Sequence, residues 1–506
     1  MLPNLELAQW VTPLNAVGFI AVYIALKLIN ALYLSPLRHI PGPLFAKSSG
    51  LYTFYMDMAG CRAKTIASVH QKYGPVVQIG PSEVCFDTMD AIDAIYGPQS
   101  ECIKAKWYDS VTRDGVFKIR NIADHRHRRK QISRGFSPAT ANELEPSTVS
   151  LVQKFIGIIE EQRQKGAMEM RHWFRMLVFD LAGVAFVGES NGALQSEKIP
   201  QFVLDMDNAF LIWDLEGRFP LLMWFIERLP IKSLQHFLNG TNRLYDYSTA
   251  AFEKYIGLYG RNPDRKDIVS KLVQKPTTGV EGLSDDLIKC EIANLTFAAT
   301  DTTSVVLSYL FWELALNPEL QSQLRAELQS PSEAPDSGVP AHQSLVKLPL
   351  LNAIIQETMR KHSPIAMGLL RETPPSGSNI GDYFIPGETV VSMSTMLAHK
   401  NPTHFPDPNS FKPSRWMSDK SDPASPDSEA SGGTEAMKKL YMPFGKGRHK
   451  CAGQAMALVT MRIIVAALVL KYGVRLAKDA KVEDMDWDDH FLIILKRGCF
   501  LDFTPV

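Results

Sequence analysis

Most hydrophobic positions along this chain recur at helical spacing, and only a few short runs have the composition of β-strands. The longest helical pattern covers residues 292–315 and is apolar on most faces, as expected for a helix through the centre of a protein. Residues 76–79 and 83–86 flank a Gly-Pro-Ser turn, which predicts a β-hairpin. The pattern therefore predicts a mainly α-helical protein with small β-sheets, within the α+β class.

The most continuous apolar stretch covers residues 10–34, with Lys27 as its main interruption. About 20 apolar residues suffice to cross a bilayer as a helix. No Lys or Arg precedes the stretch, as a cleaved signal peptide would require, and Arg38 follows it, which favours a cytosolic position for the rest of the chain. We predict a transmembrane anchor over residues 1–35 and a proline-rich hinge over residues 36–50. A buried or interfacial helix is the alternative to the anchor.

Beyond the hinge, no internal repeat or linker divides the chain, so we expect one large domain over residues 36–506. A segment rich in Ser, Asp, Pro and Gly over residues 418–433 predicts a surface loop. The 54 basic and 54 acidic side chains balance, which gives no overall bias towards nucleic acid. The six cysteines are scattered without a CxxC pair, which argues against a disulfide framework or a four-cysteine zinc site.

One cysteine has an unusual setting, because residues 444–453 place Cys451 in a glycine-punctuated, cationic loop directly before a run compatible with a helix. A thiolate ligates metal, and a helix N-terminus with nearby cations lowers the pKa of a cysteine. Phe444 offers an aromatic face beside the sulfur, and Gly447 lets the backbone approach a flat partner closely. Taken alone, such a residue is more often a buried free cysteine in a basic turn.

This loop resembles the Phe-x-x-Gly-x-x-x-Cys-x-Gly loop of the cytochrome P-450 family, in which the cysteine is the axial thiolate ligand of haem iron. Further motifs occur in the family's order along residues 36–506. The resemblance implies the cytochrome P-450 fold, a haem b cofactor (iron protoporphyrin IX) and Cys451 as the metal ligand, with Phe444 and Gly447 in the haem-binding loop. Residues 36–506 are then the catalytic domain.

A second motif resembles the family's Glu-x-x-Arg helix. Glu357 and Arg360 are three positions apart and can pair on one helix face. By itself such a pair is a common surface salt bridge worth under ~1 kcal/mol. In the family the pair lies inward and binds a second arginine, which the Phe-x-Pro-x-Arg-Trp segment supplies at Arg415. The resemblance implies that the three residues hold the scaffold of the cysteine loop.

The long helical segment contains Ala-Ala-Thr-Asp-Thr-Thr over residues 298–303, which is similar to the family's oxygen-activation motif. An acid beside an alcohol on a helix is usually surface polarity. The resemblance instead implies that Thr302 hydrogen-bonds the oxygen being activated and that Asp301 relays protons. Ala299 stands where the family usually has glycine, and an alanine makes a local bend of the helix less favourable.

Haem carries two propionates, so a buried haem needs cationic partners. By match to the family, His125 and Arg129 lie on a basic helix, Arg371 lies after the Glu-x-x-Arg helix, and His449 replaces an arginine of the cysteine loop. Arg448 is the neighbour that could substitute for it. A solvated basic helix face is the ordinary reading of the first two residues.

The resemblance also implies a function. It predicts a haem-thiolate monooxygenase that inserts one oxygen atom of dioxygen into a lipophilic small molecule of terpenoid, polyketide or alkaloid type. Electrons would come from NADPH-cytochrome P-450 reductase, and possibly cytochrome b5, because the chain has no nicotinamide or flavin fingerprint of its own. Basic residues near the cysteine, such as Lys438 and Lys446, would face the acidic donor.

The anchor and the two histidines are similar to fungal microsomal members, many of them in secondary metabolism. We therefore expect the endoplasmic reticulum membrane, with the catalytic domain on the cytosolic face. Two alternatives remain open at this point. One is a haem-thiolate enzyme of different outcome, such as ring coupling, desaturation, dealkylation or rearrangement. The other is a non-catalytic membrane haemoprotein.

Overall fold

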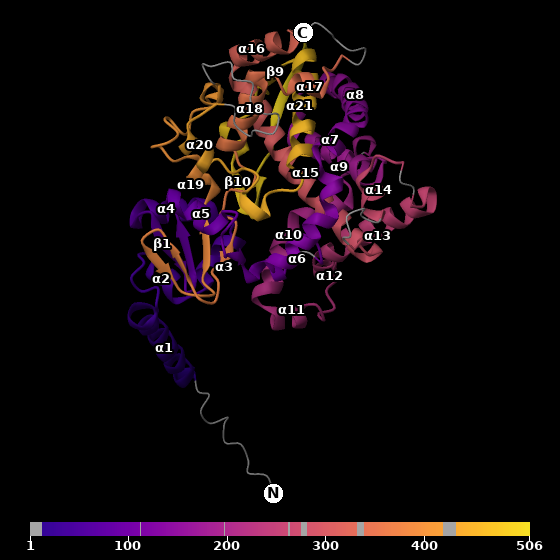
Figure 1. The fold of residues 1–506 in the computed structure, drawn as a ribbon. Helices are drawn as coiled ribbons and strands as arrows, with labels where there is room; N and C mark the ends of the chain where they lie inside the picture. The colour runs from indigo at the N-terminus through magenta and orange to yellow at the C-terminus, as the bar shows by residue number, and fades with distance from the viewer. Residues whose placement is uncertain are drawn as a thin grey trace.

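The computed structural model describes residues 13–111, 113–196, 198–261, 264–274, 281–330, 338–417 and 432–506. Helices form most of this part of the chain and surround the long helix α15 (Figure 1). The helices are α1 (Pro13–Ile29), α2 (Leu44–Ser48), α3 (Leu51–Met58), α4 (Arg62–Tyr73), α5 (Met89–Tyr96), α6 (Ile122–Ile132), α7 (Pro138–Glu143), α8 (Glu145–Gln162), α9 (Met170–Val187), α10 (Gln201–Arg218), α11 (Pro220–Ile226), α12 (Lys232–Leu238), α13 (Gly240–Tyr259), α14 (Ile268–Val273), α15 (Asp285–Leu316), α16 (Pro318–Gln329), α17 (His342–Leu345), α18 (Pro349–Lys361), α19 (Thr395–His399), α20 (Glu435–Leu440) and α21 (Gln454–Lys471).

The strands form small sheets. A five-stranded sheet has the order β1-β2-β8-β5-β3, and a three-stranded sheet has the order β4-β12-β9. The remaining described strands pair as β10-β11 and β6-β7. Their bounds are β1 (Val76–Gly80), β2 (Glu83–Phe86), β3 (Ile103–Lys104), β4 (Met168–Glu169), β5 (Arg371–Glu372), β6 (Ser378–Ile380), β7 (Tyr383–Ile385), β8 (Val390–Met393), β9 (Tyr472–Leu476), β10 (Trp487–His490), β11 (Leu492–Leu495) and β12 (Phe500–Pro505). The predicted hairpin is confirmed, because β1 and β2 pair antiparallel.

Helix α15 is the central element, and it begins seven residues before the predicted segment, at Asp285. The Ser284 side chain accepts a hydrogen bond from the Leu287 N–H, and two aspartates occupy the first turn, where a helix favours negative charge. Most of its residues are buried, and it packs closely against α9. The sequence pattern therefore identified the core helix correctly and missed only its capped, polar start.

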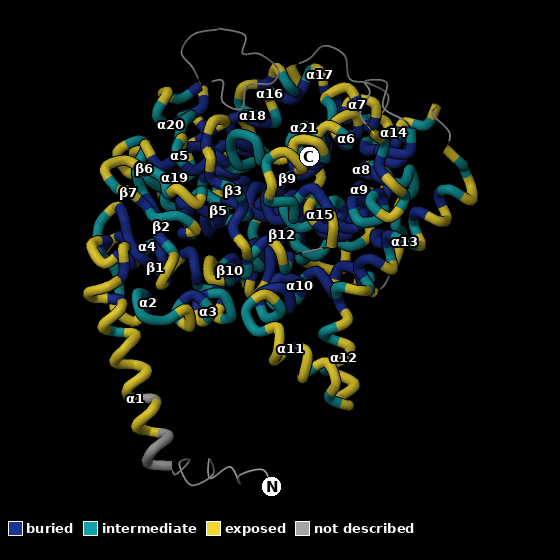
Figure 2. Tube along the Cα trace, turned by 60° about the horizontal axis from the view of Figure 1, so that its bottom comes forward, coloured by how far each residue is buried: buried dark blue, intermediate teal, exposed yellow. Residues whose placement is uncertain are grey.

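Helices α1 and α11 both project at one end of the molecule, and most of their residues are exposed (Figures 1 and 2). Leu221 and Trp224 of α11 are 84% and 57% exposed. Two helical segments of the described chain are apolar and long enough to cross a membrane, Val17–Leu34 and Gln454–Lys471. Only 6% of the residues in the first are buried, against 50% in the second, which is a core helix. The first coincides with the predicted anchor.

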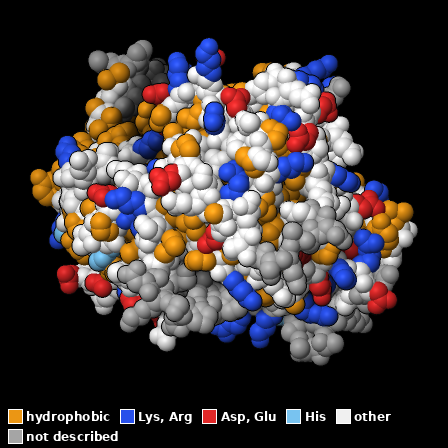
Figure 3. Space-filling view, turned by 90° about the horizontal axis from the view of Figure 1, so that it is seen from above, with side chains coloured by type: hydrophobic (Ala, Val, Ile, Leu, Met, Phe, Trp, Pro, Cys, Tyr) orange, Lys and Arg blue, Asp and Glu red, His pale blue; other side chains and the backbone are white. Residues whose placement is uncertain are grey.

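The face opposite that end carries Lys, Arg, Asp and Glu side chains interspersed with apolar ones (Figure 3). Most of the predicted surface loop over residues 418–433 lies outside the described residues. The structure describes only Gly432 and Gly433 of this segment. Gly432 lies where a Cβ would be 2.3 Å from the Trp416 carbonyl, so the chain returns to the body of the protein at this point.

Candidate active site

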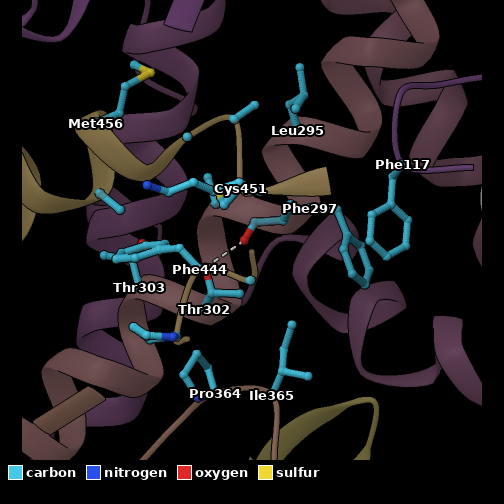
Figure 4. A pocket seen from close by; sticks show the side chains of 18 of the residues that line it. Phe117, Leu295, Phe297, Thr302, Thr303, Pro364, Ile365, Phe444, Cys451 and Met456 are labelled. Carbon is cyan, nitrogen blue, oxygen red and sulfur yellow. Dashed lines mark hydrogen bonds between the residues drawn. The ribbon is translucent and has the colours of Figure 1, made fainter. Parts of the chain in front are cut away.

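A cavity of about 320 Å³ lies between α15 and the loop that precedes α21. Cys451, Phe444 and Thr302 all line it, so the cysteine loop and the threonine of the long helix face one space. Phe117 and Met456 lie on opposite sides of Cys451 in the close view (Figure 4). Most of the wall is apolar, and seven of the lining side chains bear a cationic, imidazole or amide nitrogen. These are Lys104, His125, Arg129, Asn294, Arg371, His449 and Lys450.

The cysteine loop has a closed backbone geometry. The Cys451 N–H donates to the Phe444 carbonyl at 2.8 Å, and α21 begins three residues after the cysteine. Gly447 has φ +61°, and a Cβ there would lie 2.1 Å from the Tyr96 carbonyl. Its close approach is therefore to the end of α5, and Gly447 is not among the residues that line the cavity.

The surface of Cys451 that is exposed faces the cavity, while the body of the protein surrounds the residue. Burial raises the pKa of its thiol, against the expectation from sequence that the loop lowers it. The Gly453 backbone and Arg129 lower the pKa in part. Burial raises the pKa of the thiol more than the helix N-terminus and the nearby cations lower it. A thiolate at this position therefore needs a further positive partner in the cavity.

Five of these side chains form a cluster without a carboxylate partner among the described residues, namely Lys104, His125, Arg129, Arg371 and His449. Arg371 is 3% exposed and donates to the carbonyl of Leu370 at 2.9 Å. Arg129 donates to the Cys451 carbonyl at 3.3 Å. Neither ring nitrogen of His449 has a hydrogen-bond partner in the described part of the chain, and the centroid of its ring lies 4.2 Å from that of His125.

Lys104 belongs to the same cluster and was not predicted from the sequence. It is 4% exposed, and its Nζ donates to the carbonyls of Val116 at 3.0 Å and Phe117 at 2.6 Å. Strand β3 places it directly opposite Arg371 of β5. Two like charges in that position destabilise a ladder. The available signal was a lone lysine in the short apolar run Cys-Ile-Lys-Ala, which does not reveal a partner from a distant strand.

The cluster also holds its histidines neutral. Burial, then Lys104 and Arg129, lower the pKa of His125 to about 3. Burial, then Arg371 and Lys104, lower the pKa of His449 still further. A cationic cluster of this kind selects an anion, because a negative group would compensate charges that form no ion pair with a carboxylate among the described residues. The donor set therefore fits the propionates of a haem.

Arg448 does not reach the cavity. Its guanidinium donates to the Pro98 carbonyl at 3.0 Å and to the Ser100 carbonyl, which ties the loop to the segment after α5. Of the two neighbouring residues, His449 is the one that lines the cavity. The sequence left this choice open, because adjacent residues of a loop point in different directions.

The predicted Glu357, Arg360 and Arg415 come together in a second buried cluster. Glu357 and Arg360 are joined by two hydrogen bonds of 2.8 Å, and Arg415 Nε donates to Glu357 Oε1 at 3.1 Å. The Lys412 backbone N–H and the Trp416 indole N–H also donate to Glu357, each at 2.9 Å. The carboxylate thus accepts five hydrogen bonds while fully buried.

Arg360 is equally well satisfied. Its remaining donors reach the carbonyls of His399 at 2.9 Å, Pro408 at 2.8 Å and Ser410 at 3.3 Å. His399 Nε2 in turn accepts a hydrogen bond from the Met442 N–H at 2.9 Å. Since Met442 precedes the cysteine loop by two residues, the cluster is connected directly to the start of that loop.

The oxygen-motif residues are divided between two environments. Thr302 lines the cavity, and its Oγ1 donates to the Ala298 carbonyl at 2.8 Å. Helix α15 continues without interruption through Ala299. The Asp301 carboxylate lies outside the cavity lining and accepts from Arg175 Nε at 2.6 Å and Nη2 at 3.2 Å. Arg175 also pairs with Asp207 of α10 at 2.8 Å.

The sequence contains no local signal for Arg175, which lies on α9. It is 7% exposed, and its contacts connect α9, α10 and α15. Asp301 is therefore held in a charge pair, and a proton route through its carboxylate requires that this pair open or that a water bridge it. The structure does not bring Asp301 to the cavity in the way it brings Thr302.

Aromatic rings form the wall of the cavity remote from the cysteine loop. Phe210 packs against Phe297 and Phe491 with ring centroids 5.4 and 4.8 Å apart. Trp213 lies 5.5 Å from Phe297, and Phe117 lies 5.9 Å from Phe491. Such a wall binds flat or bulky apolar molecules through dispersion and offers few fixed polar contacts.

Comparisons with known proteins agree with this site. The cytochrome P450 family model matches residues 50–499. The chain is similar to the cytochrome P450 monooxygenase orf2 of Aspergillus niger, with 27% identity over 94% of this chain and 95% of that protein. It is 29% identical to tryprostatin B 6-hydroxylase of Aspergillus fumigatus, over 96% and 84% of the two chains. The chain is 28% identical to the cytochrome P450 monooxygenase stcB of Emericella nidulans, over 94% of this chain and 90% of that protein.

The chain therefore belongs to the cytochrome P450 family and has its α+β fold. Its function is that of an oxidoreductase, a cytochrome P450 monooxygenase, and these relatives are fungal monooxygenases. The family implies a haem held by a cysteine thiolate. The cysteine and the uncompensated cations of the cavity fit that group.

Proposed function

We propose that this protein is a haem-thiolate monooxygenase of the endoplasmic reticulum that oxygenates a lipophilic small molecule in fungal secondary metabolism, and that Cys451 is the residue whose thiolate would hold the haem iron. One observation supports the assignment above all others. A single cavity joins this cysteine to Lys104, Arg129 and Arg371, and none of these cations has a carboxylate partner among the described residues.

The residues have separate tasks in this proposal. Lys104, Arg371 and Arg129, with the rings of His125 and His449, hold the propionates. The haem, when bound, supplies dioxygen activation and one-electron chemistry. The Gly453 N–H and Arg129 stabilise negative charge on the sulfur of Cys451, since both lower its pKa against the effect of burial.

Thr302 donates or relays protons at the cavity wall. Its hydroxyl donates to the Ala298 carbonyl, and rotation about χ1 can redirect that donor into the cavity. Asp301 directly precedes Thr302 on the helix, and Arg175 holds its carboxylate in position. We assign to Arg175 the positioning of Asp301, and to the aromatic wall the exclusion of water from the substrate.

The exposed apolar helices α1 and α11 are assigned to the membrane, because they lie at one end of the molecule. The catalytic domain then lies on the cytosolic face and receives electrons from an NADPH-dependent reductase. The basic residues on the cysteine side of the molecule, such as Lys446 and Lys450, are candidates for its docking face. Electrostatic docking of this kind weakens as salt concentration rises.

The ferrous–CO difference spectrum of the full-length protein tests the ligand assignment. Cys451→Ser should abolish the thiolate signature, whereas Cys290→Ser, at a half-buried cysteine that is not among the residues lining the cavity, should retain it. Survival of the signature in Cys451→Ser would disprove the assignment. Turnover with reductase and labelled dioxygen tests the outcome, because only oxygenation transfers the label to product.

Replacement of Thr302 tests the proton route. Thr302→Ala should lower the product formed per NADPH consumed by about 100-fold, the lower end of the effect of a proton-transfer group, while the ferrous–CO signature stays intact. Thr302→Ser keeps the hydroxyl and should restore most of the coupling. Equal coupling in the wild type and both variants would argue against the role.

A further inference from the structure

A second cavity lies behind the aromatic wall, on the side of helix α3. Its volume is about 30 Å³, and Phe210 and Phe491 line both this cavity and the main one. The two rings stack with centroids 4.8 Å apart. Trp107 continues the stack, with its ring centroid 5.2 Å from that of Phe491, and it lines the second cavity but not the main one. The rings of Phe210 and Phe491 are therefore the partition between the two cavities.

The backbone of Phe491 is held in an unusual conformation. Its φ is +75°, a region that a bulky residue rarely adopts. It stands at the tip of the β10–β11 hairpin, where His490 pairs with Leu492. His490 Nδ1 donates to the Asp57 carbonyl at 3.0 Å, which fixes the tip to the end of α3. Such conformations persist only where surrounding contacts impose them, and they are common at sites that move or bind ligands.

A continuous chain of polar contacts runs from this partition towards the surface. The Trp107 indole N–H donates to Asp214 of α10 at 3.2 Å, and Arg218 Nε donates to both oxygens of Asp214 at 2.9 Å. The Nη atoms of Arg218 donate to Asp57 and Thr53 of α3. The Arg218 side chain is 25% exposed, whereas that of Asp214 is buried. Arg218 therefore joins α10 to α3 at the outer end of the second cavity, where the two helices lie side by side (Figure 2).

This junction between α3 and α10 can open without leaving a buried charge unpaired. Asp57 also accepts from Arg62 Nη1, at 2.9 Å to each carboxylate oxygen. Arg218 keeps Asp214 as a partner within its own helix. If α10 moves away from α3, each side thus retains an ion pair. The bond between Arg218 and Asp57 is itself partly exposed, and such a pair contributes little to stability, so thermal motion can break it.

Both sides of the junction carry exposed apolar side chains. Leu221 follows Arg218 by three residues, and Tyr55 belongs to α3; both are exposed. Across the junction, the rings of Phe54 and Phe219 meet edge to face with centroids 4.9 Å apart. A lipophilic molecule that approaches this end of the protein thus meets an apolar surface first, then the junction and then the ring partition.

We propose that the second cavity is the inner part of a passage by which lipophilic substrate enters the main cavity between α3 and α10. Arg218 closes the outer end through its bond to Asp57, and the stacked rings of Phe210 and Phe491 close the inner end. The inference rests on the proposed function, since it concerns the route to the same site. The residues of the passage set the rate of binding and take no part in the oxygen chemistry.

Ligand-binding kinetics test the outer end of the passage. Full-length haem-loaded enzyme in lipid nanodiscs is mixed in a stopped-flow instrument with clotrimazole, a bulky azole, or with imidazole, and the haem difference spectrum is followed. Asp57→Asn removes the charge that Arg218 binds and leaves Arg62 paired with Glu83. Clotrimazole should associate and dissociate about fivefold faster, the upper end of the contribution of a partly exposed ion pair, at unchanged Kd. Imidazole has only five ring atoms, needs far less opening and should keep its wild-type rates.

A second variant tests the inner end. Phe491→Ala removes one ring of the partition and should also speed the association of clotrimazole about fivefold, within the range of an aromatic pair. Phe297→Ala is the matched control, because it removes a ring that borders the main cavity alone. It should speed dissociation through lost contacts and leave the association rate within about twofold of the wild type.

Two further variants separate the passage from a general loosening of α10. Asp205→Asn makes the same change at the ion pair that joins α10 to α13 through Arg243, whose side chain is as exposed as that of Arg218. It should leave both rates of clotrimazole unchanged. Thr53→Val removes an acceptor of Arg218 and keeps every charge, so it should speed both rates about threefold. This variant carries the test if Asp57→Asn does not fold.

The results support or overturn the passage as follows. A wild-type association rate in Phe491→Ala, or in the folded variants of Asp57 and Thr53, overturns it. Equal acceleration in Asp205→Asn, or of imidazole, overturns it as well. The ferrous–CO signature is recorded on every sample. Wild type with the thiolate signature and variants without faster binding refute the passage alone, whereas a wild type without the signature refutes the proposed function and the passage with it.

Discussion

Two buried clusters of basic side chains lie on either side of the cysteine loop, and they differ in what neutralises them. In the first cluster, Arg360 and Arg415 both bind the carboxylate of Glu357, which accepts five hydrogen bonds in total. Around the cavity, Lys104 and Arg371 face each other across a strand pair, and their described contacts are with carbonyls or aromatic rings. The first cluster is complete within the chain, and the second requires an anion from outside it.

The contrast shows how to distinguish a structural charge from a binding charge when both are buried. Arg360 and Arg371 are 1% and 3% exposed, so burial does not separate them. The two arginines differ in how fully their N–H donors are satisfied. This difference matters because a charge removed from water is stable only when it is compensated. Removing a member of the complete cluster should therefore damage the fold, whereas removing a member of the incomplete one should damage ligand binding.

The largest effect is expected for Glu357→Ala. It leaves two buried guanidiniums and an indole N–H without their acceptor, which should cost about 3–5 kcal/mol of unfolding free energy. Urea unfolding of the purified protein measures this loss. Glu435→Ala, at a carboxylate that is 91% exposed, is the control and should change stability by less than ~0.5 kcal/mol. Similar losses in both variants would contradict the structural role of the complete cluster.

The opposite pattern is expected for Arg371→Met. Haem affinity should fall about 10- to 100-fold, because a charge-assisted bond to an anion is lost. The haem-free protein should be as stable as the wild type or more stable, because Lys104 loses a like charge opposite it. Haem transfer kinetics and urea unfolding of the apoprotein measure the two quantities.

Arg448→Met is the matched control for that variant, since its guanidinium binds two carbonyls outside the cavity lining. It should leave haem affinity within about threefold of the wild type. A larger loss of affinity in Arg448→Met than in Arg371→Met would reverse the assignment of the propionate partners.

A pH effect of intermediate size is expected at His399. Burial, then Arg360, lower its pKa to about 3, so the folded protein keeps it neutral. The unfolded chain binds a proton there below its ordinary pKa of about 6.5, so the free energy of unfolding falls as pH decreases from 6.5 towards 3. The contribution of this residue reaches about 2 kcal/mol at pH 5.

His399→Gln keeps an acceptor for the Met442 N–H and removes the titration. Denaturant unfolding at pH 7 and pH 5 should show a smaller loss of stability in the variant than in the wild type. Other buried histidines with a lowered pKa, such as His342 and His362, also reduce the free energy of unfolding as the pH falls. The quantity to compare is therefore the difference in pH dependence between the wild type and His399→Gln. Identical pH dependence would contradict the assignment.

The smallest effect is expected for Arg415→Lys. Arg415 is bonded to Glu357 and to the carbonyls of Pro406 and Asp407, and a lysine keeps the charge but not the planar fork. We expect a loss of about 1 kcal/mol of unfolding free energy without loss of haem affinity. A loss of haem affinity at unchanged stability would place Arg415 functionally with the cavity cluster and blur the distinction.

Local patterns in the sequence were sufficient for the helical character, the β1–β2 hairpin, the central helix and the position of the cysteine loop. Each depends on residues close together in the chain, as do the spacing of Glu357 and Arg360 and the glycine turn before Cys451. Family resemblance then added Arg415, Arg371 and Thr302, which the structure brings to the expected clusters.

Contacts between distant segments decided the rest. Lys104 joins the cation cluster only because β3 pairs with β5, and Asp301 is turned towards Arg175 because α9 packs against α15. His449 faces the cavity while Arg448 faces the Pro98 carbonyl, a difference of one residue that backbone direction sets. The residue types and their spacing thus determined which chemistry is possible, and packing determined which charges are left uncompensated, since compensation depends on neighbours in space.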